Sequence, residues 1–164
     1  ATTEIYTLSL HDALPIYLGF GNIGTATWLA PARCMRAGEQ AVAELGLDKY
    51  AALFVGAYTG TQDLTAMLYE SWDLAGIDRS YREFIDLHRP EAERLAREGA
   101  IAPEDAFVGY IGLIDRWRQL PFRDPGLPRE LLADDWSAPE AVALFEHLVG
   151  QLEGRALAHA ARYW

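Results

Sequence analysis

Apolar residues recur with helical spacing from Asp63 to the C-terminus, and this period constrains the fold more than any other feature of the sequence. Asp63 can cap a helix whose inner stripe falls at i, i+3, i+4 and i+8. That stripe consists of Leu64, Met67, Leu68 and Trp72. Asp78 can cap a second helix with Tyr81, Phe84 and Ile85 inward. Pro90 suits the first turn of a third helix, which Gly99 would end.

Two stronger helices follow. Pro103 opens the first, in which Phe107, Ile111 and Ile114 share a face. The second begins at Ser137, which with Glu140 has the spacing of a capping box. Its buried stripe would be Leu144, Phe145, Leu148 and Leu152. Between them, residues 120–135 are too rich in proline for a long helix and predict an ordered connector. Residues 63–164 are therefore expected to form a domain of about five helices.

The preceding residues have a different pattern. Thr25–Leu29 is rich in β-branched and aromatic residues, and Ala51–Tyr58 is an apolar run, so both are predicted strands. Between them, Arg33–Leu45 is a predicted helix that Gly46 would end. Residues 17–62 thus indicate part of a small α+β domain, and α+β is the predicted class of the whole chain.

Residues 1–16, ATTEIYTLSLHDALPI, resemble no domain start. They read as one translated frame of a widely used short-read sequencing adapter, and we expect them to be foreign to the fold. The alternative is a genuine N-terminal strand with alternating apolar residues. We also expect that the natural sequence upstream of Tyr17 is missing.

Composition narrows the classes of function. The chain of 164 residues carries 24 acidic and 14 basic side chains and a formal net charge of −10, which repels a polyphosphate backbone. We do not expect it to bind DNA by itself. No apolar stretch is long enough to span a bilayer, and a cytoplasmic protein is expected. The single cysteine, Cys34, excludes an intrachain disulfide, and no spacing indicates a metal site or a bound cofactor.

A glycine-rich motif suggests one enzyme class. Gly19, Gly21 and Gly24 satisfy the G-x-G-x-x-G pattern of dinucleotide-binding folds. That mechanism needs a strand before the glycines and a helix directly after them. Pro31 falls where the helix should continue, so a turn is the stronger interpretation and a nucleotide-binding oxidoreductase fragment is the alternative. The histidines lie far apart without the H-E-x-x-H spacing of a zinc hydrolase, and no catalytic residues are predicted.

Arginines interleaved with aromatic residues form the most informative cluster. It comprises Arg116, Trp117, Arg118, Phe122, Arg123 and Trp136. Guanidinium groups pair with phosphate and aromatic faces accept a ring, so the cluster could hold an anionic ligand with an aromatic end. In the other interpretation the arginines form ion pairs with nearby aspartates, and the aromatic residues pack in the core.

The spacing of these residues resembles a known family. Trp117-Arg118, Asp124-Pro125, Leu127-Pro128, Leu131-Leu132 and Asp135-Trp136 resemble the C-terminal domain of the PaaX-like repressors of phenylacetate degradation. Trp72 and Tyr81 match the entry to that domain, and Gly19-Phe20 resembles the end of the family's Cas2-like, ferredoxin-like middle domain. Ala133 and Ser137-Ala138 depart from the family's usual Pro and Pro-Gly.

The resemblance implies a homodimeric repressor that binds operator DNA through an N-terminal winged helix absent from this chain. It also implies release from DNA when an aryl-CoA, such as phenylacetyl-CoA, binds. That effector fits the arginine and aromatic cluster, to which Trp72 and Tyr81 are added as candidate ligand-binding residues. A Cas2-like nuclease is a rival function, but its acidic metal ligands near the first strand are not found in this sequence.

Overall fold

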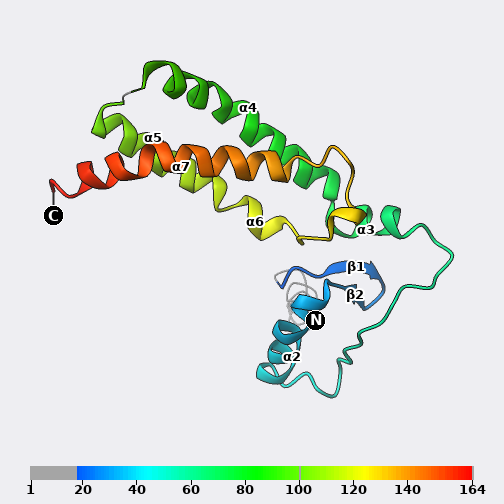
Figure 1. Cartoon of the computed structure of the whole chain (residues 1–164). Helices are drawn as coiled ribbons and strands as arrows, with labels where there is room; N and C mark the ends of the chain where they lie inside the picture. Colours follow the sequence, from blue (N-terminus) through cyan, green and yellow to red (C-terminus); the bar gives the residue numbers. More distant parts are fainter. Residues whose placement is uncertain (1–17, 100, 164) are drawn as a thin grey trace, which may run out of the picture. The chain divides into compact units, whose positions relative to one another are not determined.

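A computed structural model describes residues 18–99 and 101–163, and the expectation for residues 1–16 falls outside them. The described chain forms two compact units (Figure 1). The first unit comprises residues 18–74 and Arg123–Leu132, and the second comprises Ala75–Phe122 and residues 133–163. Both strands lie in the first unit, whereas the second is helical. The described chain is therefore α+β, as predicted.

The sheet of the first unit has two short antiparallel strands. Strand β1 (Gly21–Gly24) pairs with β2 (Thr27–Leu29), with Asn22 opposite Trp28. Among residues 18–99 and 101–163 this is the only sheet, so a ferredoxin-like arrangement is not seen there. A 3-10 turn η1 (Ala32–Cys34) then leads into helix α2 (Met35–Glu44). The predicted helix end is confirmed, since Gly46 has a φ of +64°.

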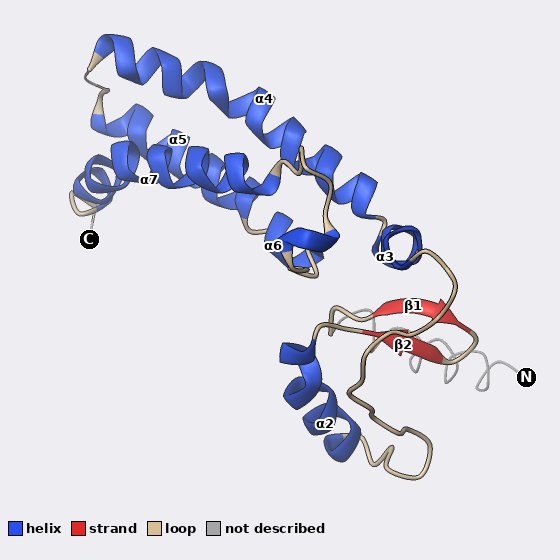
Figure 2. Cartoon of the chain, turned by 45° about the vertical axis from the view of Figure 1, so that its right-hand side comes forward, coloured by secondary structure: helices blue, strands red, loops and turns tan. Residues whose placement is uncertain are grey.

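Helix α3 (Leu64–Trp72) begins at the predicted cap. Asp63 Oδ1 accepts hydrogen bonds from the amides of Thr65 at 2.9 Å and Ala66 at 3.4 Å. The strand predicted at residues 51–58 is wrong, because this segment has no regular secondary structure (Figure 2). Phe54 is 88% exposed there. A strand needs a neighbour for its backbone groups, and no described residue supplies one.

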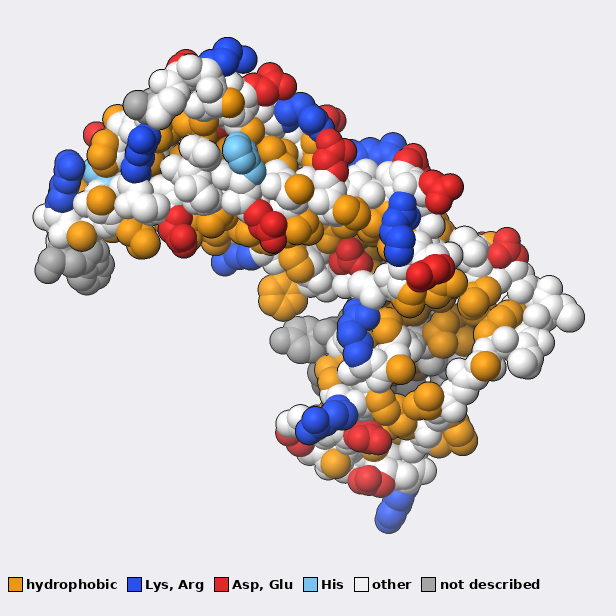
Figure 3. Space-filling view, in the orientation of Figure 1, with side chains coloured by type: hydrophobic (Ala, Val, Ile, Leu, Met, Phe, Trp, Pro, Cys, Tyr) orange, Lys and Arg blue, Asp and Glu red, His pale blue; other side chains and the backbone are white. Residues whose placement is uncertain are grey.

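The second unit consists mainly of three long helices. Helix α4 (Leu74–Glu98) starts at the unit boundary, α5 (Pro103–Trp117) and α7 (Ala138–Ala160) follow, and α5 and α7 lie side by side (Figures 1 and 2). Short helix α6 (Leu120–Arg123) and the 3-10 turn η2 (Arg129–Leu131) interrupt the predicted connector. On the face drawn in Figure 3, acidic and basic side chains are interspersed along the helices.

Two predicted helix starts are wrong, because α4 runs unbroken through Asp78 and Pro90. Its buried positions form one continuous stripe with helical spacing along the whole length. These are Leu74, Ile77, Tyr81, Phe84, Ile85, His88, Ala92 and Leu95. Packing of this stripe outweighs the hydrogen bond that Pro90 cannot make. Asp78 instead accepts a hydrogen bond from the amide of Ser137, at the start of α7, at 2.8 Å.

The buried face of α5 also differs from the face that the sequence suggested. Ala106 and Leu113 are fully buried, whereas Ile111 is 51% exposed. Gly109 lies on the packed side of α5, where a Cβ built on it would be 3.0 Å from the Glu91 carboxylate of α4 and at an ordinary contact distance, 3.6 Å, from Leu152 of α7. Ala106, Gly109 and Leu113 therefore face the neighbouring helices, and Ile111 lies outside this packed side.

The predicted capping box at the start of α7 does not form. Ser137 is the N-cap residue, but its side chain makes no capping hydrogen bond. Its hydroxyl instead accepts a hydrogen bond from Arg82 Nε at 3.1 Å, and the Glu140 carboxylate accepts one from Arg89. Both side chains are therefore engaged by arginines of α4, which sequence spacing alone does not reveal.

Candidate functional site

The second unit is held together by a cluster of aromatic rings around Trp117. The Trp117 ring stacks on Phe145 of α7 with centroids 4.4 Å apart and planes at 10°. It also contacts Phe84 at 5.2 Å and Tyr81 at 6.3 Å, both from α4. Trp136 meets Tyr81 edge-on at 6.2 Å. The structure thus brings together three of the predicted site residues: Tyr81, Trp117 and Trp136.

Burial decides what these three rings can do. Tyr81 is 3% exposed and Trp136 is 7% exposed, while Trp117 is half-buried. Ring pairs of this kind stabilise a core by about 0.5–1.5 kcal/mol beyond the area they bury. Their direct effect is to fix α5 against α4 and α7, and so to orient the residues that follow Trp117.

Arginine side chains flank Trp117 in the sequence. Arg116 and Arg118 are both exposed. Arg118 forms an ion pair with Asp115 at 2.7 Å, and both partners of this pair are largely exposed. Such a pair contributes little to stability, since solvent screens it. It leaves donors of the planar guanidinium available for an anion.

The remaining predicted site residues are divided between the two units. Phe122 is 90% exposed and belongs to the second unit, whereas Arg123 and Trp72 belong to the first. Trp72 Nε1 donates a hydrogen bond to the carbonyl of Gly19 at 3.0 Å. Its ring also lies so close to Gly21 that a Cβ there would be 2.7 Å away. Trp72 thus has a packing role, holding β1 against α3.

His88 is a buried polar residue that the sequence analysis did not single out. Its ring lies 4.6 Å from that of Phe84, and its Nε2 has no hydrogen-bond partner among the described residues. Burial lowers the pKa of His88, Glu91 at 3.9 Å from Nδ1 acts to raise it, and Arg116 acts to lower it. The sequence did carry a signal, because His88 lies four residues after Phe84 on the inner stripe of α4.

A polar network at the start of α7 was also missed. Arg82 contacts Asp78 at 2.7 Å, Asp135 at 3.2 Å and the hydroxyl of Ser137 at 3.1 Å. Asp78 also accepts the amide hydrogen of Ser137. The network links α4 to the start of α7, close in sequence to the buried Trp136.

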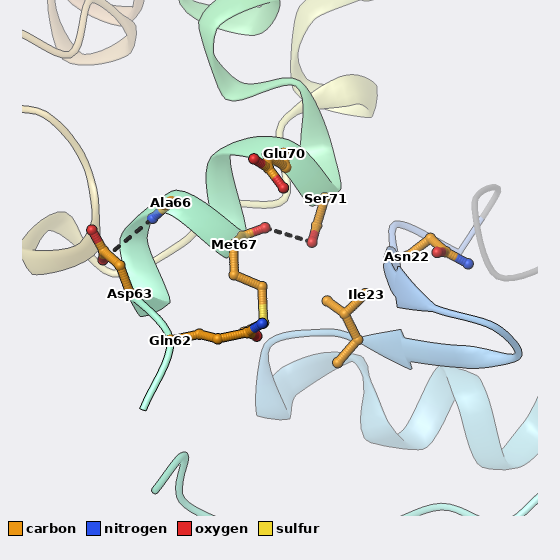
Figure 4. A pocket seen from close by; sticks show the side chains of 8 residues that line it. All are labelled: Asn22, Ile23, Gln62, Asp63, Ala66, Met67, Glu70 and Ser71. Atoms are coloured by element: carbon orange, nitrogen blue, oxygen red, sulfur yellow. Dashed lines mark hydrogen bonds between the residues drawn. The ribbon is translucent and has the colours of Figure 1, made fainter. Parts of the chain in front are cut away.

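A shallow pocket of about 440 Å³ lies between β1 and α3 in the first unit (Figure 4). Ile23 and Met67 give it an apolar side, and Asp63 and Glu70 give it an acidic one. None of the predicted site residues lines it. An acidic lining repels phosphate, so this pocket does not suit an anionic ligand.

The glycine-rich motif has a different structure from the predicted turn. Gly21 to Gly24 form β1, and β2 follows it in place of a helix. The backbone therefore lacks the strand, turn and helix order that cradles a pyrophosphate, and the oxidoreductase alternative is not favoured. Within residues 18–99 and 101–163 no group of three or more potential ligands could hold a metal ion. In the same residues no helix is long and apolar enough to cross a membrane.

Comparison with known proteins decides the family. The model described as "PaaX-like protein C-terminal domain" matches residues 72–162, more than half of the chain. The chain belongs to this family. The transcriptional repressor PaaX of Escherichia coli (strain K12) is 28% identical over 148 residues, which cover 87% of this PaaX-like chain. The matched part spans 46% of the length of that repressor. The predicted family resemblance is confirmed.

Proposed function

We propose that this chain is the effector-sensing and dimerising part of a bacterial transcriptional repressor. The observation that carries the proposal is the family match, which spans residues 72–162 and so includes α4, α5 and α7. In this proposal residues 63–164 are the helical PaaX-like domain and residues 17–62 belong to a ferredoxin-like middle domain. The E. coli relative is named a transcriptional repressor and is about twice as long as the matched part.

Operator DNA would be bound by a winged-helix domain outside this chain. The net charge of −10 supports that division, because DNA binding depends largely on neutralising phosphates with basic side chains. The sensing part can be acidic overall, provided that basic groups are concentrated where the effector binds.

We further propose an aryl-CoA effector, such as phenylacetyl-CoA. Its phosphates would be recognised by the exposed guanidinium groups of Arg116 and Arg118. The exposed ring of Phe122 offers a stacking surface for the adenine or the aryl group. Tyr81, Trp117 and Trp136 are buried or half-buried and would act as positioning residues.

Isothermal titration calorimetry with phenylacetyl-CoA tests this assignment. The double variant Arg116→Ala/Arg118→Ala should bind at least about tenfold more weakly, since charge-assisted hydrogen bonds contribute about 1.5–3 kcal/mol each. The matched control is Arg79→Ala/Arg97→Ala, which removes the same charge from exposed positions of α4 and should change affinity less than about twofold. Equal affinity in both doubles, or no heat of binding with the unmutated chain, would refute the aryl-CoA site.

A further inference from the structure

The buried stripe of α4 contains one imidazole, that of His88, which is 7% exposed. Its Nδ1 lies 3.9 Å from a carboxylate oxygen of Glu91, which is beyond hydrogen-bond distance. Its Nε2 has no hydrogen-bond partner among the described residues. Buried polar atoms are nearly always paired, so a titratable ring with an open nitrogen is uncommon in a helical core.

Two contacts between α4 and α5 fix the level of this imidazole. The carboxylate of Glu91 lies against Gly109, where a built Cβ would be 3.0 Å from it. The ring of Phe84 lies 5.2 Å from that of Trp117. The later residue of α4 thus meets the earlier residue of α5, so the two helices run antiparallel. Because His88 lies between Phe84 and Glu91 on the same stripe, it faces the part of α5 between their two partners.

That part of α5 includes Arg116, the residue before Trp117. Burial lowers the pKa of His88 most, Glu91 raises it, and Arg116 also lowers it. On α4, Arg94 lies 3.9 Å from Glu91 and shares its carboxylate. The buried residues of α7 carry no charge and are Ala141, Leu148, Leu152 and Ala156. His88 is therefore set between one acidic and one basic side chain, and only the basic one belongs to the proposed effector site.

We infer that His88 and Arg116 form a proton-linked pair, in which an anion bound by Arg116 draws a proton from solvent onto His88. The anion cancels the positive charge that Arg116 presents to the imidazole, while the Glu91 carboxylate still attracts the proton. A hydrogen on Nδ1 faces Glu91, so the added proton goes to the open Nε2. Linkage is reciprocal, and protonated His88 in turn strengthens anion binding at Arg116. The inference rests on the proposed effector site and adds to it a residue inside the helical core.

The first experiment needs no effector and measures the pKa of His88 by NMR titration of the ring signals. The spectrum of His88→Leu identifies its signal among the four histidines. Arg116→Ala removes the charge that an anion would cancel and should raise the pKa of His88. The matched control Arg79→Ala removes an exposed arginine about 13 Å away along α4 and should leave this pKa unchanged. The same pKa of His88 in Arg116→Ala and in the unmutated chain would overturn the inference.

The second experiment compares the binding of phenylacetyl-CoA at about pH 7.5 and about pH 5.5 by calorimetry, on either side of the ordinary pKa of histidine. Acidification should strengthen binding to the unmutated chain by about twofold more than binding to His88→Leu. The phosphates of the effector titrate in both chains, so the comparison isolates His88. An equal pH dependence in the two chains would contradict the inference. No binding at either pH would refute the aryl-CoA effector, and the titration of Arg116→Ala would still decide whether the pair is coupled.

Discussion

The second unit buries most of its large apolar side chains, whereas the first unit exposes several of them. In the helical unit the long helices bury one stripe each, and Leu113, Leu148 and Leu152 are fully enclosed. In the first unit, residues 50–58 expose Tyr50, Phe54, Val55 and Tyr58 by 86%, 88%, 70% and 43%. A helix satisfies its own backbone and needs only a surface to pack on, whereas a strand also needs a neighbour for its hydrogen bonds. Apolar residues with helical spacing are therefore buried more directly than an apolar run that predicts a strand.

The largest test of this contrast is a cavity in the helical unit. Leu148→Ala removes a side chain with no exposed surface at the centre of α7 and should lower the free energy of unfolding by about 2–5 kcal/mol. Urea unfolding followed by circular dichroism measures the change. Leu157→Ala, on the exposed side of the same helix, should cost less than about 0.5 kcal/mol. Similar losses in the two variants would mean that α7 is not packed as described.

The first unit offers a test of close packing without a large core. Gly21→Ala places a Cβ 2.7–2.8 Å from Trp72 and Ser71 and should destabilise the contact of β1 with α3 by about 1–3 kcal/mol. Hydrogen exchange should accelerate in residues 18–29 and stay unchanged in α7. Gly24→Ala is the control, because its Cβ would meet nothing within 4 Å. Faster exchange in α7 would show that the units do not respond separately.

A smaller effect is expected where α4 supports the start of α7. Asp78→Ala removes the acceptor for the Ser137 amide and a partner of Arg82, and should cost about 1 kcal/mol, as the loss of a helix cap does. Asp135→Ala removes the 78% exposed partner of the same arginine and should be nearly neutral. The difference in urea midpoint between the two variants is the measurement, and equal midpoints would count against a capping role for Asp78.

The smallest expected effect concerns pH. Burial lowers the pKa of His88 below its ordinary value of 6.5, so the unfolded chain binds a proton more readily than the folded one. The contribution of neutral His88 to the free energy of unfolding is therefore fully present above pH 6.5. It is lost as the pH falls from 6.5 toward the lower pKa that His88 has in the folded chain. Thermal unfolding at several pH values should show this loss in the unmutated chain and less of it in His88→Leu. His147→Leu, at an exposed position, should keep the full pH dependence.

Local signals predicted the features that depend on local chemistry. Asp63 caps α3, and Gly46 and Gly99 follow α2 and α4 with φ values of +64° and +68°, because capping and left-handed backbone are decided within a few residues. The inward positions Tyr81, Phe84 and Ile85 were also correct. The family was recognisable from residue spacings around the proline-rich connector, and the match over residues 72–162 confirms it.

Features that depend on distant partners were not predictable in the same way. The capping box at Ser137 failed because Arg82 and Arg89, more than 50 residues earlier, engage its two side chains. Asp78 and Pro90 are residue types that favour helix starts, which is why two starts were predicted there. The helix continues past both residues because tertiary packing stabilises the buried stripe of α4. In the candidate site, the burial of Tyr81 and Trp136 depends on ring contacts between residues far apart in the sequence, which spacing alone does not reveal.

The guanidinium of Arg33, which donates hydrogen bonds to the carbonyls of Pro125 and Gly126, has a consequence for the order of events during protein synthesis. Residues 123–132 belong to the first unit although they are made after α4 and α5. The chain leaves the ribosome from its N-terminus. The hydrogen bonds of Arg33 in the first unit therefore cannot form until residues 123–132 have been synthesised. The last residues of the N-terminal unit therefore emerge only shortly before α7, which ties the maturation of the two units to the same late stage of translation.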